Sequence, residues 1–146
     1  MKTTPTILIV DTEPDVVAAT TRACAAPGYD VLQARSGAEG IEIALREIPD
    51  VVILGTVLEG EDGIEICRRI TAAPTLRSVF VVMACDTRLS SEEAAEVLDA
   101  GAVELFERPL HDHELIVRLR MLVRLAETEA RVDAAQGFLD TVLDQS

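Results

Sequence analysis

Residues 6–15 read TILIVDTEPD: five β-branched or aliphatic residues, an acidic residue, and then a new segment that starts near Pro14. The run TILIV predicts a strand over 6–10 that is covered on both faces, because its apolar residues do not alternate with polar ones. Pro14 suits the first turn of a helix, where a missing N–H removes no hydrogen bond. A buried strand that leads through a short acidic turn into a helix predicts the first unit of an α/β fold.

The same alternation of a short strand and a longer helix repeats along the chain. Runs rich in β-branched residues predict strands, and segments with apolar residues at spacings of three and four predict helices. The predicted strands are 6–10, 30–34, 50–54, 79–84 and 103–106, and the predicted helices are 14–26, 38–47, 64–72, 91–100 and the segment after Asp112. This order predicts an α/β fold of the flavodoxin-like type: a doubly wound five-stranded parallel sheet in a three-layer αβα sandwich, with an extended C-terminal helix.

Length and composition exclude several classes of protein. With 146 residues, 49% of them hydrophobic and 27% charged, the chain is long enough for one compact domain and too apolar to be disordered. No apolar run approaches the roughly 20 residues of a membrane-spanning helix, and the N-terminus lacks the apolar stretch of a signal peptide. Three cysteines without a CxxC pair fit a reducing compartment. We therefore expect a cytoplasmic protein without a membrane partner.

The charge of the chain is strongly negative. It has 26 acidic and 13 basic residues, for a formal net charge of −13, and such a surface repels the phosphates of nucleic acids. No direct nucleic-acid partner is therefore expected. Lys2 is the only lysine, so Arg108 is the only plausible cation close to the strand ends.

In a doubly wound sheet, ligands and chemistry gather at the carboxyl ends of the strands, next to the point where the strand order reverses. The residues at these ends are Asp11, Thr12 and Glu13 after the first strand, Gly55 and Thr56 after the third, Cys85 and Asp86 after the fourth, and Glu107, Arg108 and Pro109 after the fifth. These positions form the candidate site.

Six segments occur in an order and spacing typical of one protein family: ILIVDTEPD, GYDVLQARSGAEGIEIA, PDVVIL, EDGIEICRRI, GAVELFERPL and HELIVRLRMLVR. Over about residues 5–125 the sequence resembles the receiver domains of bacterial two-component response regulators. The resemblance implies an acidic pair after the first strand, a phosphoacceptor aspartate ending the third, a threonine or serine ending the fourth, and a lysine before a proline after the fifth. In that family these groups and a magnesium ion form and stabilise an acyl phosphate.

Four of these five positions differ in this chain. Asp11 is kept, but Thr12 replaces its acidic neighbour, Gly55 the acceptor, Cys85 the hydroxyl residue and Arg108 the lysine. Glycine has no side-chain atom that attacks phosphorus, so the resemblance implies a degenerate pseudo-receiver that lacks the phosphoacceptor. Asp11 is the only retained metal ligand, so magnesium is expected to bind weakly at most, and no other cofactor is implied. We also expect Arg108 to pair with Asp11, since a guanidinium prefers a carboxylate.

Two alternatives to this interpretation stay open. Glu59, Glu61 and Asp62 crowd the loop after the third strand, and one of them is a candidate for a displaced phosphoacceptor, although a solvated acidic loop is favoured. Cys85 is a candidate thiol redox sensor if Arg108 lowers the pKa of its thiol, although a buried structural thiol is favoured.

The last helix continues beyond what a receiver needs. We divide the chain into a receiver-like domain over 1–125 and a helical extension over 126–146 that serves as a signalling or coiled-coil linker. A heptad frame places Leu122, Leu125, Glu129, Val132, Gln136, Leu139 and Leu143 along one seam, and Leu122, Leu125, Val132 and Leu139 are the predicted contacts with a second chain. A frayed tail is the alternative.

Together these features predict a two-component signalling module that is not an enzyme and acts by protein–protein interaction, independently of phosphorylation. The expected partners are a histidine kinase or a sensory or effector module, and a homodimer is expected. A phosphorylatable receiver with a non-standard acceptor and a redox sensor at Cys85 are the two other functions considered.

Overall fold

The computed structural model describes the backbone of residues 4–144 and the side chains of residues 4–129 and of Leu143. Its elements follow the chain in this order: β1 (Thr6–Val10), α1 (Pro14–Ala25), β2 (Asp30–Ala34), α2 (Gly37–Glu47), β3 (Val51–Gly55), β4 (Val57–Leu58), β5 (Glu61–Asp62), α3 (Gly63–Ala72), the 3-10 helix η1 (Pro74–Leu76), β6 (Phe80–Cys85), α4 (Ser91–Asp99), β7 (Glu104–Glu107) and α5 (Asp112–Asp144).

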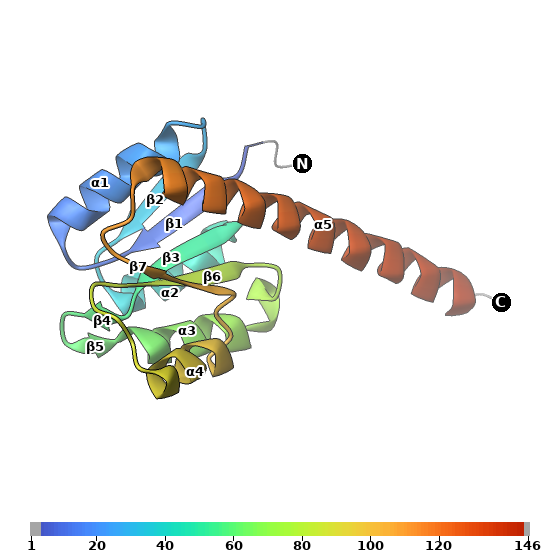
Figure 1. The fold of residues 1–146 in the computed structure, drawn as a ribbon. Helices are drawn as coiled ribbons and strands as arrows, with labels where there is room; N and C mark the ends of the chain where they lie inside the picture. Colours follow the sequence, from blue (N-terminus) through green and yellow to red (C-terminus); the bar gives the residue numbers. More distant parts are fainter. Residues whose placement is uncertain (1–3, 145–146) are drawn as a thin grey trace.

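Five parallel strands form the central sheet, in the order β2-β1-β3-β6-β7 (Figure 1). Helices α1 and α5 cover one face of this sheet, and α2, α3 and α4 cover the other. The strand order reverses between β1 and β3, which are paired directly. The fold predicted from the sequence is confirmed, and each predicted strand lies within one residue of an observed strand.

The two faces of the sheet belong to separate cores, because successive residues of a strand point to opposite faces. In β1, Leu8 and Val10 pack in the core under α2, α3 and α4, whereas Ile7 and Ile9 pack in the core under α1 and α5. β3 and β6 alternate in the same way. The central strands therefore need apolar residues along nearly their whole length, which is the pattern that made them easy to predict.

A short antiparallel hairpin follows β3, where the sequence predicted a solvated acidic loop. β4 and β5 pair Val57 with Asp62 and Leu58 with Glu61, and Gly60 takes a φ of +74° at the turn. Leu58 is buried and packs in the core under α2, α3 and α4. Strands of two residues have no detectable periodicity, so the sequence pattern could not predict this hairpin.

Helix α5 continues past the edge of the sheet and projects away from the rest of the domain (Figure 1). Leu122 is 7% exposed and packs in the core under α1 and α5, so little of its side chain is left for the predicted contact with a second chain. Leu125 is exposed, as a contact of that kind requires. The side chains of Val132 and Leu139 lie outside the described residues. Among residues 4–144, none of the helices combines the length and apolar character that crossing a bilayer requires.

Candidate functional site

The predicted site residues gather at the carboxyl edge of the sheet. Asp11 follows β1, Gly55 ends β3, Cys85 ends β6 and Arg108 follows β7. Because these strands are neighbours in that order and run parallel, their carboxyl ends meet at one edge. Thr12 follows Asp11 and is half-buried.

Asp11 and Arg108 form an ion pair at the centre of this edge. Arg108 donates from Nη1 to Asp11 Oδ2 at 2.8 Å, and Asp11 Oδ1 accepts from the backbone N–H of Glu13 at 3.1 Å. The side chains of Asp11 and Arg108 are 5% and 19% exposed. Both carboxylate oxygens of Asp11 are therefore engaged within the chain, and the pairing expected from the sequence is confirmed.

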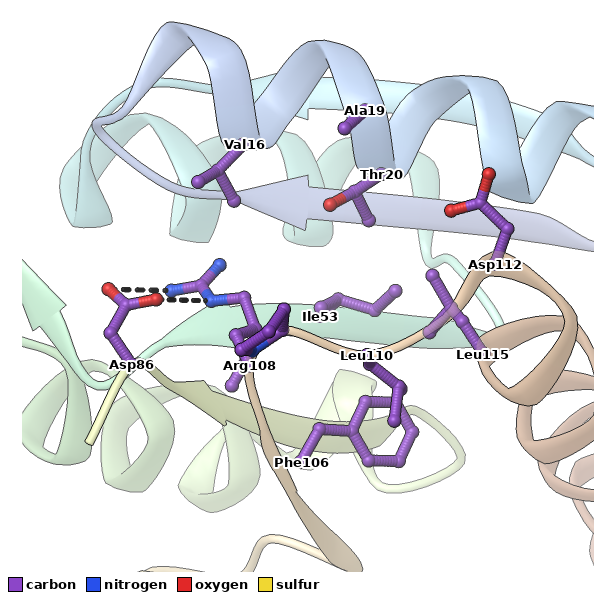
Figure 2. Close-up of a pocket in the computed structure, with 12 residues that line it drawn as sticks. Val16, Ala19, Thr20, Ile53, Asp86, Phe106, Arg108, Leu110, Asp112 and Leu115 are labelled. Atoms are coloured by element: carbon purple, nitrogen blue, oxygen red, sulfur yellow. Dashed lines mark hydrogen bonds and ion pairs between the residues drawn. The ribbon is translucent and has the colours of Figure 1, made fainter. Parts of the chain in front are cut away.

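The same guanidinium binds a second carboxylate, that of Asp86, and no local sequence pattern indicates this pairing. Arg108 donates from Nε to Asp86 Oδ1 at 2.8 Å and from Nη2 to Asp86 Oδ2 at 3.4 Å, a two-point contact that Figure 2 shows. The backbone N–H of Arg108 also donates to the carbonyl oxygen of Cys85 at 2.7 Å. Arg108 thus holds the ends of β1 and β6 together, because its planar fork offers donors in two directions.

Gly55 lies against the carboxylate of Asp11. A Cβ atom added at Gly55 would lie 2.9 Å from Asp11 Oδ2 and 3.4 Å from both Asp11 Cγ and Leu58 Cδ2. Asp11 therefore fills the space where a side chain on residue 55 would begin. The glycine and the Asp11–Arg108 pair fit one another, and a larger residue at position 55 would require Asp11 to move.

Gly63 allows the start of α3 to pack on the end of β3. Its N–H donates to the carbonyl oxygen of Thr56 at 3.0 Å, and a Cβ added at Gly63 would overlap the carbonyl oxygen of Gly55. The close backbone contact holds the β4–β5 hairpin beside the candidate site.

Two acidic residues of this hairpin accept hydrogen bonds from helix N-termini. Glu61 accepts from the N–H of Gly37, the first residue of α2, at 2.8 Å. Asp62 is the N-cap of α3 and accepts from the N–H of Ile64 at 3.0 Å. Two of the three carboxylates considered as displaced acceptors therefore have structural partners, and Glu59 is exposed. Negative groups at helix N-termini stabilise both the free N–H groups and the helix dipole.

Cys85 lies in the sheet and not in a solvent-accessible cleft. Its side chain is 1% exposed, and its Sγ donates to the carbonyl oxygen of Phe106 at 3.4 Å. Burial raises the pKa of the Cys85 thiol, Glu107 raises it further, and Arg108 lowers it by less. The condition for the redox alternative, a thiol pKa lowered by Arg108, is therefore not met.

A cavity of about 420 Å³ lies beside the ion pair, between α1 and the connection from β7 to α5 (Figure 2). Its walls are mostly apolar, and its polar groups come from Thr20, Asp86, Arg108 and Asp112. The volume lies within the range of pockets that bind small molecules or single side chains of a partner. The sequence did not predict this cavity, because it arises from the packing of α1 against the β7–α5 connection.

Comparison with known proteins gives the same family at the level of sequence and fold. Residues 7–120 match the family model of the response regulator receiver domain. Response regulator MprA of Mycobacterium leprae (strain TN) is 32% identical over 139 residues, which cover 94% of this chain and 60% of that protein. Response regulator MprA of Mycobacterium ulcerans (strain Agy99) is 33% identical over 141 residues, which cover 94% of this chain and 60% of that protein.

Solved structures of other proteins share the fold. A CheY-like response regulator receiver domain protein from Methanospirillum hungatei JF-1 has a TM-score of 0.80 and 21% identity, and the match covers 87% of this chain and 99% of that chain. A putative response regulator from Chloroflexus aurantiacus J-10-fl has a TM-score of 0.76 and 26% identity, and the match covers 83% of this chain and 98% of that chain. The chain belongs to the response regulator receiver domain family. It spans about 60% of the length of the MprA relatives.

The residues of the site do not fit the magnesium ion that receivers of this family use. Asp11 is the only carboxylate at the family's ligand positions, and Arg108 already holds it at 2.8 Å. Thr12 and Gly55 supply no carboxylate, and the guanidinium would repel a divalent cation. Within the described side chains, no three His, Cys, Asp or Glu residues are grouped so that they could hold a metal ion.

Proposed function

We propose that this chain is a receiver-like signalling module of a two-component system that works without an acyl phosphate, by contact with protein partners. The observation that carries the proposal is the fit between Gly55 and the Asp11–Arg108 pair. The acceptor carboxylate is missing at Gly55. The Asp11 carboxylate lies against that position, and Arg108 binds it. The module is not an enzyme in this proposal, because Gly55 has no side chain that could attack phosphorus.

The charge balance of the site supports a domain that needs no cation or phosphate. A receiver with an acidic pair and an acceptor aspartate places three carboxylates together, and these repel one another. Here Asp11 and Asp86 share the guanidinium of Arg108. Arg108 makes a bidentate contact with Asp86 and a buried contact with Asp11. These two contacts hold the β7–α5 connection to the sheet.

The apolar cavity next to Arg108 supports a protein partner. Val16 and Ala19 of α1, and Leu110 and Leu115 near the start of α5, line it. An apolar side chain of a partner that entered this cavity would be desolvated, which is typical of the anchor residues of interfaces. We infer that the partner is a histidine kinase or a sensory or effector module, in keeping with the family. The net charge of −13 disfavours nucleic acid as a direct partner of this chain.

Thermal unfolding with magnesium and beryllofluoride, a mimic of the phosphoryl group on aspartate, tests this proposal. A ligand that binds only the folded state raises the melting temperature. We expect no rise for the wild-type chain, and a rise for the Thr12→Asp/Gly55→Asp variant, which restores the two missing carboxylates. A rise of several degrees for the wild-type chain would contradict the proposal and favour a non-standard acceptor.

A further inference from the structure

One face of α5 carries apolar side chains that the domain leaves uncovered. Val117, Met121 and Leu125 are spaced four residues apart and are 43%, 66% and 46% exposed. On the side of the same helix that faces the sheet, Leu119 and Leu122 are buried in the core under α1 and α5. The core contacts therefore fix how α5 is rotated, and they turn Met121 outward in place of Leu122.

The sequence alone extends the apolar pattern beyond the described side chains. From Met121 and Leu125, alternating steps of three and four lead to Thr128, Val132, Ala135, Leu139 and Val142, and six of these seven residues are apolar. The frame chosen from the sequence alone instead contained the buried Leu122 and the polar Glu129 and Gln136. Both frames share Leu125, Val132 and Leu139, so the sequence pattern alone does not decide between them. The burial of Leu122 favours the frame that contains Met121.

Thr128, the one polar residue of this face, has its hydroxyl satisfied within the helix. Its Oγ1 donates to the carbonyl oxygen of Arg124 at 3.0 Å. A threonine whose hydroxyl is already bonded adds little desolvation cost at a helix interface, because its methyl group remains available for packing.

The charges beside this face indicate a second copy of the same helix in parallel orientation. With Leu125 at heptad position a, Arg124 is at g and Glu129 is at e, and both are exposed. In a parallel pair, a g residue faces the e residue that lies five positions later on the other helix. Arg124 of one chain would thus face Glu129 of its partner, twice by symmetry.

We propose that α5 forms a parallel two-stranded coiled coil with a second copy of this chain, with Met121, Leu125, Thr128, Val132, Ala135, Leu139 and Val142 in the seam. This seam spans about 33 Å at 1.5 Å per residue, roughly three heptads. Leu119, Val123 and Ala126 are buried at positions b, f and b of this frame, on the side of each helix away from the seam. The proposal concerns assembly and does not rest on whether the domain accepts phosphate.

Disulfide trapping of the full chain tests the register. Cysteine at 135 lies in the proposed seam, whereas cysteine at 136 lies in the seam of the other frame. Under mild oxidation we expect Ala135→Cys to give a covalent dimer rapidly and Gln136→Cys to do so slowly, with the wild-type chain as control because its three cysteines are buried. Faster trapping at 136, or no trapping at 135, would overturn the parallel register.

Sedimentation equilibrium of the full chain tests the interface itself. We expect a dimer for the wild-type chain, a monomer for Leu139→Glu, which places a charge in the seam, and a dimer for Ala134→Glu, which places the same charge outside it. A monomeric wild-type chain, or a dimer that Leu139→Glu leaves intact, would overturn the proposal.

Discussion

Arg108 Nη1 lies 2.8 Å from Asp11 Oδ2, a contact between residues that are 97 positions apart in the chain. The contact joins the end of β1 to the connection between β7 and α5, and the guanidinium reaches on to Asp86 on the other side. The positive charge between these two carboxylates is the guanidinium of Arg108. We therefore expect the stability of the domain to depend on the contacts of Arg108 with Asp11 and Asp86.

Breaking this pair should destabilise the domain. In Arg108→Met, the buried carboxylate of Asp11 loses its partner, and we expect a loss of about 3 kcal/mol in the free energy of unfolding. Urea denaturation measures it. Asp86→Asn should cost less than about 1 kcal/mol, because the Asp86 side chain is 66% exposed. The double variant Asp11→Asn/Arg108→Met should recover part of the loss. If Arg108→Met alone is as stable as the wild-type chain, the Asp11–Arg108 pair does not stabilise the domain.

Restoring a carboxylate at position 55 should also destabilise the domain in the absence of a divalent cation. Gly55→Asp places a Cβ 2.9 Å from Asp11 Oδ2 and a second negative charge beside it, so we expect a loss of at least about 2 kcal/mol. Gly55→Ala carries the steric effect without the charge and is the matched control. Gly55→Asp should lose more stability than Gly55→Ala. Millimolar magnesium should reduce the loss in Gly55→Asp and leave Gly55→Ala unchanged. Equal stability of the two variants would argue against charge repulsion.

Glu61 should contribute to stability as a helix cap. Glu61→Ala removes the acceptor of the Gly37 N–H and should cost about 1 kcal/mol, with faster hydrogen exchange at the amide of Gly37. Glu59→Ala, two residues earlier in the same hairpin and exposed, is the control and should change neither quantity. Equal effects of the two substitutions would show that general acidity of the hairpin, and not capping, matters.

The buried thiols should make the domain less stable at alkaline pH. Burial raises the pKa of Cys24 from 9.0 to about 12 and that of Cys67 from 9.0 to about 11. Between these values the unfolded chain loses thiol protons that the folded chain keeps, so the free energy of unfolding should fall as the pH rises from about 9 to 12. Denaturant titrations at several pH values measure this fall.

Cys24→Ala should make that dependence shallower, even though the cavity it creates lowers stability at every pH. The chain suits this measurement because it has one lysine, so few ammonium groups titrate in the same range. An unchanged slope in Cys24→Ala would mean that the thiol of Cys24 is not protected from water in the folded state.

Much of the fold could be predicted from the sequence, because the central strands are buried on both faces. The run TILIV in β1 has both faces covered, so its apolar pattern is long and unbroken. The pairing of Arg108 with Asp11 was also predictable, since the chain has no lysine near the strand ends. Asp86 was at the correct edge, but no local pattern indicates that it shares the guanidinium of Arg108.

The features that sequence reasoning missed depend on contacts between distant segments. Glu61 caps a helix whose first residue is 24 positions away, and the cavity beside Arg108 forms between α1 and the start of α5. The rotation of α5 is a further case: Leu122 and Met121 are both apolar, and only packing against the sheet decides which of them is buried.

We propose that the carboxyl edge of this sheet does not accept a phosphoryl group. Intact mass spectrometry after incubation with acetyl phosphate and magnesium tests it most directly, with Thr12→Asp/Gly55→Asp as the variant that regains both carboxylates. We expect an unchanged mass for the wild-type chain. A wild-type adduct of about 80 Da that hydroxylamine removes, as it removes an acyl phosphate, would show that this edge of the sheet is phosphorylated.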